Sequence, residues 1–277
     1  MQTNHETCVT FRLAGSKQAL ILLPVFVDGR GPYSFVLDTG AGSTVVSNEL
    51  ADALALPRGE KQDGRGAAGK MTLVKSQVPS LTVGDETIES FPVSVTDLSF
   101  LGRAMGVQVD GALGQTFLRH FAMTLDYATN ALTLRRPVGG TERALDEREI
   151  AFQWANAEDL LVVVPVFVNK KGPYDFALDT GASSTVISLE LAAECGLATE
   201  KISQLTAGGG NGIVSRVQLG SLSVGAARQE NLAAAASDFL TQLNAELGSE
   251  LQGIVGYDFM RHYRVTLDYP RGTLTLE

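Results

Sequence analysis

The sequence contains two copies of one unit, arranged in tandem. Residues 20–56 align without a gap to residues 161–197, and a constant offset of 141 residues relates them. Residues 110–134 match residues 252–276 at an offset of 142, so one inserted residue separates the two registers. A repeat of this length largely decides the architecture, because each copy is expected to fold into the same unit. The chain is therefore predicted to form two similar lobes.

The segment between the two copies has the composition of a linker. It carries Pro137, a pair of glycines and several charged side chains without periodicity, and such segments rarely form regular structure. We expect an N-terminal lobe over residues 1–136, a linker over residues 137–149 and a C-terminal lobe over residues 150–277.

Composition and charge narrow the class of protein. Apolar residues make up 44% of the 277 residues and charged residues 19%, which is ordinary for a globular protein and argues against disorder and coiled coils. The net charge of −9 has the wrong sign for collecting phosphates, so no nucleic-acid partner is expected. The apolar runs are too short to span a bilayer. The first residues lack the features of a signal peptide, so the expected compartment is the cytoplasm, or the periplasm or exterior if a signal was removed.

Cysteine and histidine give no sign of a disulfide framework or a metal site. The two cysteines, Cys8 and Cys195, occupy unrelated places in the repeat, and the three histidines, with no third or fourth type of ligand nearby, give no metal signature. We therefore expect free thiols, no metal and no cofactor.

Within each copy the local patterns favour short strands. Alternating apolar residues predict a half-buried strand at the start of each copy, over residues 9–13 and 150–154. Ser47 and Ser188 are placed to cap short helices, and a second short helix is predicted over residues 115–121 and in its copy, residues 257–263. The spacing leaves no room for the long crossover helices of a parallel sheet, so the predicted fold is all-β.

The repeated triplet Asp-Thr-Gly, at residues 38–40 and 179–181, is the strongest chemical signal. Each triplet follows an apolar strand, and a single such Asp would ordinarily be a turn residue. Two lobes related by a pseudo-two-fold axis bring equivalent residues together at that axis. Asp38 and Asp179 would then share one proton, because two adjacent carboxylates cannot both ionise cheaply. Such a pair supplies a general acid and a general base to one water molecule.

These features resemble the retropepsin-like aspartic proteases, with two protease units fused in one polypeptide. The matching segments are LDTGAGSTVVS from Leu37 and LDTGASSTVIS from Leu178, each followed by an apolar-apolar-Gly motif ending at Gly114 or Gly256. The resemblance implies a bilobed, pepsin- or retropepsin-like fold with pseudo-two-fold symmetry. It also implies that Asp38 and Asp179 are the catalytic pair, supported by the other residues of their loops, namely Thr39, Gly40, Thr180 and Gly181.

The family covers its cleft with glycine-rich hairpins called flaps, and the resemblance places them in residues 64–71 and 207–213. Neither segment has the aromatic residue that pepsin-like enzymes carry there, so two flaps of the retroviral kind are expected. The candidate substrate-binding residues are Gly66, Ala67, Ala68, Gly69, Gly208, Gly209 and Gly210.

The resemblance also implies the partner and the mechanism. An extended peptide or protein substrate would add as a strand to the flaps, and a water held between the aspartates would hydrolyse it. Ala41 and Ala182 stand where pepsin-like enzymes often carry a hydroxyl that favours the ionised carboxylate, so a mildly acidic optimum is expected.

Two alternatives stay open at this level. The first is a non-proteolytic peptide-binding or scaffold protein with the same fold. The second is that each half pairs with a half of another chain, although a short linker favours a monomer with the lobes paired in cis by effective concentration. The other repeated acids, Asp97 with Asp238 and Asp126 with Asp268, are interpreted as turn or cap residues.

Overall fold

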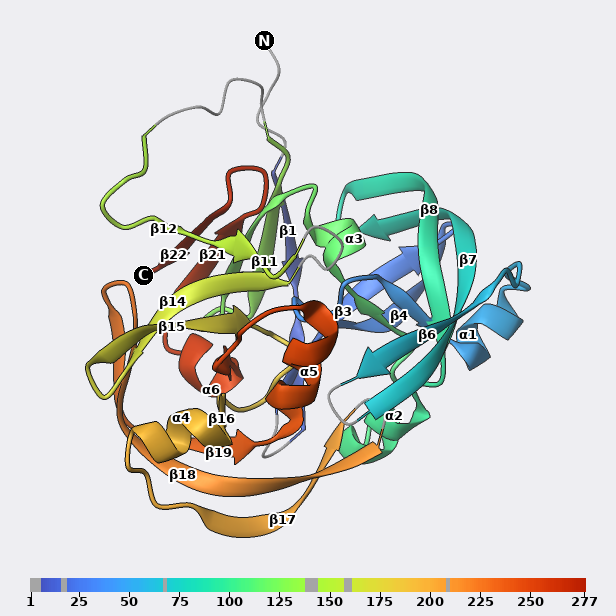
Figure 1. Cartoon of the computed structure of the whole chain (residues 1–277). Helices are drawn as coiled ribbons and strands as arrows, with labels where there is room; N and C mark the ends of the chain where they lie inside the picture. The colour runs from blue at the N-terminus through green and yellow to red at the C-terminus, as the bar shows by residue number, and fades with distance from the viewer. Residues whose placement is uncertain (1–5, 16–18, 67–68, 138–143, 157–160, 208–209) are drawn as a thin grey trace.

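The computed structural model of the protein describes residues 6–15, 19–66, 69–137, 144–156, 161–207 and 210–277 (Figure 1). Its strands form two eight-stranded sheets and one six-stranded sheet. Each half of the chain supplies one of the larger sheets, and the six-stranded sheet takes strands from both halves. The all-β, two-lobed prediction is confirmed.

The two larger sheets have the same strand order, position by position. In the first half the order is β2 (Arg12–Ala14), β3 (Leu20–Val27), β4 (Arg30–Leu37), β9 (Gly111–Leu113), β5 (Val45–Ser47), β8 (Glu86–Thr96), β7 (Gly69–Val83) and β6 (Lys61–Gly66). In the second half it is β13 (Gln153–Trp154), β14 (Val162–Val168), β15 (Lys171–Leu178), β20 (Gly253–Val255), β16 (Val186–Ser188), β19 (Ala227–Ser237), β18 (Gly210–Val224) and β17 (Glu200–Ala207).

The six-stranded sheet joins the lobes. Its order is β1 (Glu6–Thr10), β11 (Ala131–Arg135), β10 (Ala122–Asp126), β21 (Arg264–Asp268), β22 (Thr273–Leu276) and β12 (Ile150–Ala151). The central pair, β10 and β21, is antiparallel and centred on Thr124 opposite Thr266, whose hydroxyl oxygens lie 2.9 Å apart. These two threonines are equivalent in the repeat, so the pseudo-two-fold axis passes between them.

The predicted strand at the start of each copy is in fact two strands in two sheets. β1 belongs to the six-stranded sheet and β2 to the first lobe, and β12 and β13 divide in the same way. The chain changes sheet at Phe11, whose N–H bonds Asn130 O at 2.8 Å outside either ladder. Alternation of apolar residues continues through the break, which is why sequence periodicity could not detect it.

Six short helices are described. Ser47 and Ser188 cap α1 (Asn48–Ala53) and α4 (Leu189–Glu194), as predicted, by accepting the N–H of the residue three positions ahead. α3 (Gln115–Leu118) and α6 (Tyr257–Met260) are shorter than predicted because the chain leaves the helix for a turn before β10 and β21. The remaining two, α2 (Ser99–Met105) and α5 (Phe239–Leu247), were not predicted.

The main core is continuous through both lobes and the sheet that joins them. It contains buried side chains from Val9 to Leu274, and two smaller apolar clusters lie beneath α2 and α5. Among the described residues, no helix has the length and apolar character needed to cross a bilayer.

Candidate active site

Each Asp-Thr-Gly triplet directly follows the buried end of a strand. β4 runs parallel to β9 in the centre of its sheet, and the chain leaves β4 at Asp38, whose N–H still bonds Leu113 O at 3.1 Å. The second lobe repeats this arrangement with β15, β20, Asp179 and Val255, again at 3.1 Å. The apolar strands therefore fix where each carboxylate leaves the sheet.

The two loops are locked together by Thr39 and Thr180. Each threonine is buried, and each hydroxyl crosses to the other half of the chain. Thr39 Oγ1 donates to Leu178 O at 2.8 Å and accepts the N–H of Thr180 at 2.9 Å. Thr180 Oγ1 donates to Leu37 O at 2.8 Å and accepts the N–H of Thr39 at 3.1 Å. Four buried hydrogen bonds thus hold the two triplets in one rigid unit.

The glycine of each triplet allows the opposite carboxylate to come close. A β-carbon at position 40 would lie 2.5 Å from Asp179 Cγ, and one at position 181 would lie 2.8 Å from Asp38 Cγ. Each glycine N–H also donates to the carboxylate of its own triplet, at 3.0 Å for Asp38 and 2.7 Å for Asp179. A larger residue at either position would have to displace the opposite carboxylate or the loop that carries it.

The environment favours the protonated form of both carboxyl groups. Burial is the largest cause that raises the pKa of Asp38, and the charge of Asp179 and a hydrogen bond with it raise that pKa further. Burial also raises the pKa of Asp179, although the N–H groups of Gly181, Gly40 and Ala182 oppose it. Both side chains keep partial exposure to solvent. The geometry therefore places two carboxyl groups next to each other and leaves both partly open to solvent.

The motif that ends at Gly114 or Gly256 packs under each loop. A β-carbon at Gly114 would lie 2.6 Å from Ala41 O, and the N–H of the next residue, Gln115, donates to the same oxygen at 2.8 Å. In the second lobe Tyr257 N–H donates to Ala182 O at 2.8 Å. The glycines are thus required for close packing of the helix against the loop.

A second layer of polar contacts differs between the lobes and was not predicted. In the first lobe Thr116 Oγ1 accepts the N–H of Thr44 at 2.9 Å. In the second lobe the carboxylate of Asp258 replaces it, and accepts the N–H of Thr185 at 2.8 Å and the Thr185 hydroxyl at 2.7 Å. Burial raises the pKa of Asp258. The alignment pairs Thr116 with Asp258, so the sequence contained this difference, but no local pattern marks it as a contact.

Hairpins occupy the intervals predicted for the flaps. β6 pairs with β7 up to Gly66 opposite Gly69, and β17 pairs with β18 up to Ala207 opposite Gly210. Ala67, Ala68, Gly208 and Gly209 lie outside the described residues. The prediction that these hairpin tips bind substrate stays a prediction.

The other repeated acids form local turns. Asp97 accepts the N–H of Ser99 at 2.8 Å just before α2, and Asp126 and Asp268 accept N–H groups of the turns that follow them. Asp238 begins α5 without a side-chain cap. Cys8 and Cys195 are free thiols. No group of three or more potential metal ligands occurs among the described residues.

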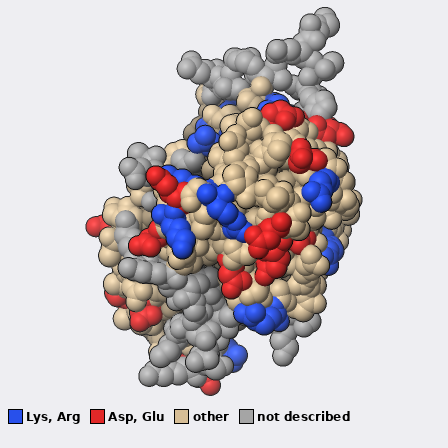
Figure 2. All heavy atoms as spheres, turned by 90° about the vertical axis from the view of Figure 1, so that its right-hand side faces the viewer, with Lys and Arg blue, Asp and Glu red and all other residues tan. Residues whose placement is uncertain are grey.

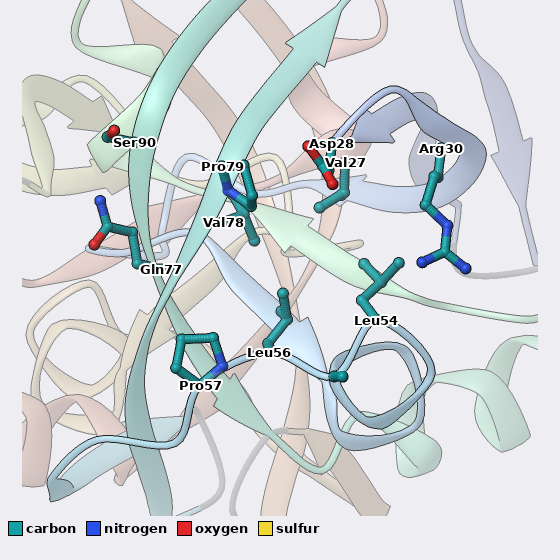
Figure 3. Close-up of a pocket in the computed structure, with 11 residues that line it drawn as sticks. Val27, Asp28, Arg30, Leu54, Leu56, Pro57, Gln77, Val78, Pro79 and Ser90 are labelled. Atoms are coloured by element: carbon teal, nitrogen blue, oxygen red, sulfur yellow. The ribbon is translucent and has the colours of Figure 1, made fainter.

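A surface pocket of about 330 Å³ lies on the first lobe, away from both triplets (Figure 3). Leu54, Leu56 and Val78 form part of its lining, and its single acidic lining residue is Asp28. It therefore has no pair of carboxylates. On the face in Figure 2, basic and acidic side chains of the described residues are interspersed, and they form no extended basic patch.

The fold and the site define a class: an all-β protein of two similar lobes, with a pair of partly exposed aspartates where the lobes meet. A family model described as aspartyl protease matches the chain twice, over residues 23–117 and 164–259, and each match contains one triplet. The chain belongs to this aspartyl protease family. A comparison with curated proteins gives no match.

Proposed function

We propose that the protein is an aspartic endopeptidase in which Asp38 and Asp179 activate one water molecule between them. The observation that carries this proposal is the set of four hydrogen bonds that Thr39 and Thr180 make across the two loops, which keeps the two carboxyl groups next to each other. A pair that shares one proton supplies a base and an acid together. The ionised member removes a proton from water as the water attacks the peptide carbonyl. The protonated member donates to the carbonyl oxygen, so no covalent intermediate is needed.

The proposed substrate is an extended peptide or protein segment. The hairpin tips around Gly66, Gly69 and Gly210 would donate and accept backbone hydrogen bonds, so that the substrate adds as a strand. The two lobes, with the boundaries given above, would form this site within a single monomeric chain. The family membership of both halves supports an intact pair of lobes.

Cleavage of a mixed peptide library from pH 3 to pH 8 tests the proposed chemistry. The wild type should cleave, and Asp38→Asn and Asp179→Asn should each lose activity while keeping the wild-type circular dichroism spectrum. Asp97→Asn is the matched control, because it makes the same chemical change at an exposed turn. A folded wild type that cleaves nothing at any pH would instead support the peptide-binding alternative.

A mixture of the two inactive variants tests whether the lobes pair in cis. If halves of different chains pair, a mixture of Asp38→Asn and Asp179→Asn contains sites with two wild-type aspartates, and activity returns. If the lobes of one chain pair, every site keeps one asparagine and the mixture stays inactive. We expect the inactive mixture, together with a monomer mass by light scattering.

A further inference from the structure

A buried side-chain amide lies directly beneath the Asp38 loop. Gln115, the first residue of α3, is 0% exposed, and its Nε2 donates to Thr39 O at 2.7 Å. The same nitrogen lies 3.4 Å from the hydroxyl oxygen of Tyr269. Tyr269 follows β21 in the second half of the chain, so this contact joins the opposite lobe to the loop of Asp38.

The contact reaches Asp38 through one peptide group. The C=O of the Thr39–Gly40 peptide accepts from Gln115, and the N–H of the same peptide donates to Asp38 Oδ1 at 3.0 Å. Hydrogen bonds at the two ends of a peptide group polarise one another, so donation to the C=O makes the N–H a stronger donor. Gln115 therefore strengthens a bond to the ionised form of Asp38 without touching the carboxylate.

Tyr269 is held in place by aromatic packing. Its side chain is 5% exposed, its ring stacks on Trp154 with centroids 6.0 Å apart, and Phe152 meets it edge-on at 6.0 Å. A phenol fixed in this way defines where the Gln115 amide can lie.

The equivalent position in the other lobe lacks this contact. Tyr257 stands where the first lobe has Gln115, and its ring packs edge-on against Tyr127, the counterpart of Tyr269, with centroids 5.6 Å apart. Among the described residues the Tyr127 hydroxyl has no hydrogen-bond partner, and no side chain is found to donate to Thr180 O. The two repeats therefore differ at this position. A side-chain amide contacts the Asp38 loop in the first lobe, and two packed aromatic rings take the equivalent place in the second lobe.

We propose that Gln115 and Tyr269 are positioning residues that orient the Thr39–Gly40 peptide against Asp38 and make the two aspartates inequivalent. As a statement about catalysis, this inference rests on the proposed function. The titratable groups that face Asp38 among the described residues are Asp179 across the axis and the Tyr269 phenol. Removing the amide weakens the Gly40 N–H bond, which favours the ionised carboxylate. The pair then keeps its proton to higher pH.

Three variants test the pair. Gln115→Met keeps the shape and removes the amide, and Tyr269→Phe removes the hydroxyl. Tyr127→Phe is the matched control, because it removes a hydroxyl at the equivalent position of the other repeat. The first two should lower kcat by about 3- to 10-fold and move the acid limb of the pH profile up by roughly 0.4 to 1 pH unit. The Tyr127→Phe control should not move the acid limb of the pH profile. The double variant Gln115→Met with Tyr269→Phe should lose less activity, expressed as free energy, than the sum of the losses of the two single variants.

A measurement that does not require activity separates this inference from the proposed function. Aspartate labelled with ¹³C at Cγ gives NMR signals, and Asp38→Asn and Asp179→Asn assign the two resonances of the pair. Gln115→Met and Tyr269→Phe should raise the pH at which the pair titrates. If no variant cleaves peptides but this shift is seen, the proposed function fails and the inference stands. An unchanged titration in a folded Tyr269→Phe, or an equal shift in Tyr127→Phe, would overturn the inference.

Discussion

Gly40 faces the carboxylate of Asp179 at a distance that leaves no room for a side chain. A β-carbon at position 40 would lie 2.5 Å from Asp179 Cγ, well inside van der Waals contact. Such an overlap requires the Asp179 carboxylate, or the loop that carries it, to move. The third residue of each triplet therefore sets how closely the two carboxyl groups approach.

Gly40→Ala should displace the carboxylate of Asp179 or the loop that carries it. We expect a loss of proteolysis of about 100-fold, since displacing reacting groups by about 1 Å has effects of this size, and a decrease of about 1–3 kcal/mol in the free energy of unfolding. Gly42→Ala is the control, because a β-carbon there meets nothing within 4 Å. Peptide cleavage and urea denaturation measure both effects, and equal behaviour of the two variants would contradict the close approach.

Thr39→Val should destabilise the contact between the lobes. The hydroxyl both donates to Leu178 O and accepts the N–H of Thr180, so its loss leaves buried backbone groups unpaired at a cost of about 1–3 kcal/mol. Thr39→Ser keeps the hydroxyl and should recover most of this loss. The midpoint of urea denaturation reports the difference. A serine variant as unstable as the valine variant would show that the methyl group, not the hydroxyl, matters here.

Most of this fold was predicted from the tandem repeat and from local sequence motifs. Tandem copies predicted two lobes, Ser47 and Ser188 predicted the first helix of each lobe, and the triplets predicted where the polar groups meet. Each of these signals lies within a few residues or is doubled by the repeat. Their structural consequences could therefore be reasoned from the sequence alone.

The features that were missed depend on contacts between distant segments. Phe11 sits where the chain moves from one sheet to another, and only the ladder partners reveal this break. The contact of Gln115 with Tyr269 joins residues 154 positions apart, and from the sequence Asp268, the residue before Tyr269, is interpreted only as a turn or cap residue. Asp126 and Asp268 do form turns, whereas the Tyr269 hydroxyl contacts Gln115 of the opposite half of the chain. No local pattern distinguishes those two roles.

Glu149, which immediately precedes β12, should be important for stability. Its carboxylate pairs with both guanidinium nitrogens of Arg271, and the two side chains are 9% and 12% exposed. Removing Glu149 leaves Arg271 with only the charge of Asp268 beside it, so Glu149→Ala should lower the free energy of unfolding by more than the loss of an exposed ion pair does. Glu60→Ala removes an exposed pair with Lys75 and should cost less than about 1 kcal/mol. Thermal unfolding compares them, and equal losses would contradict a special role for the buried pair.

Stability should depend on pH through the paired aspartates. Burial and mutual charge raise the pKa of Asp38 in the folded chain, so the folded state binds a proton more tightly than the unfolded state, whose aspartates titrate near pH 3.9. Between that pH and the raised pKa, the free energy of unfolding falls as pH rises, and above this window the cost persists in full. Asp38→Asn removes the cost and should raise Tm at pH 7, by about 2–4 °C for each kcal/mol gained.

The same comparison at low pH distinguishes this effect from a general change in packing. At about pH 3, well below the pKa of unfolded aspartate near 3.9, both aspartates of the wild type are mostly protonated in either state, so most of the advantage of Asp38→Asn should disappear. Asp97→Asn should instead lower Tm at neutral pH. Hydrogen bonds from Ser99 lower the pKa of Asp97, so its ionised form stabilises the fold at any pH above the one at which the unfolded aspartate titrates. Calorimetry from pH 3 to pH 8 gives both curves. An Asp38→Asn variant with a Tm below wild type at pH 7 would show that the two carboxyl groups do not oppose folding. The two carboxyl groups would then lie close together without the charge repulsion inferred for the pair.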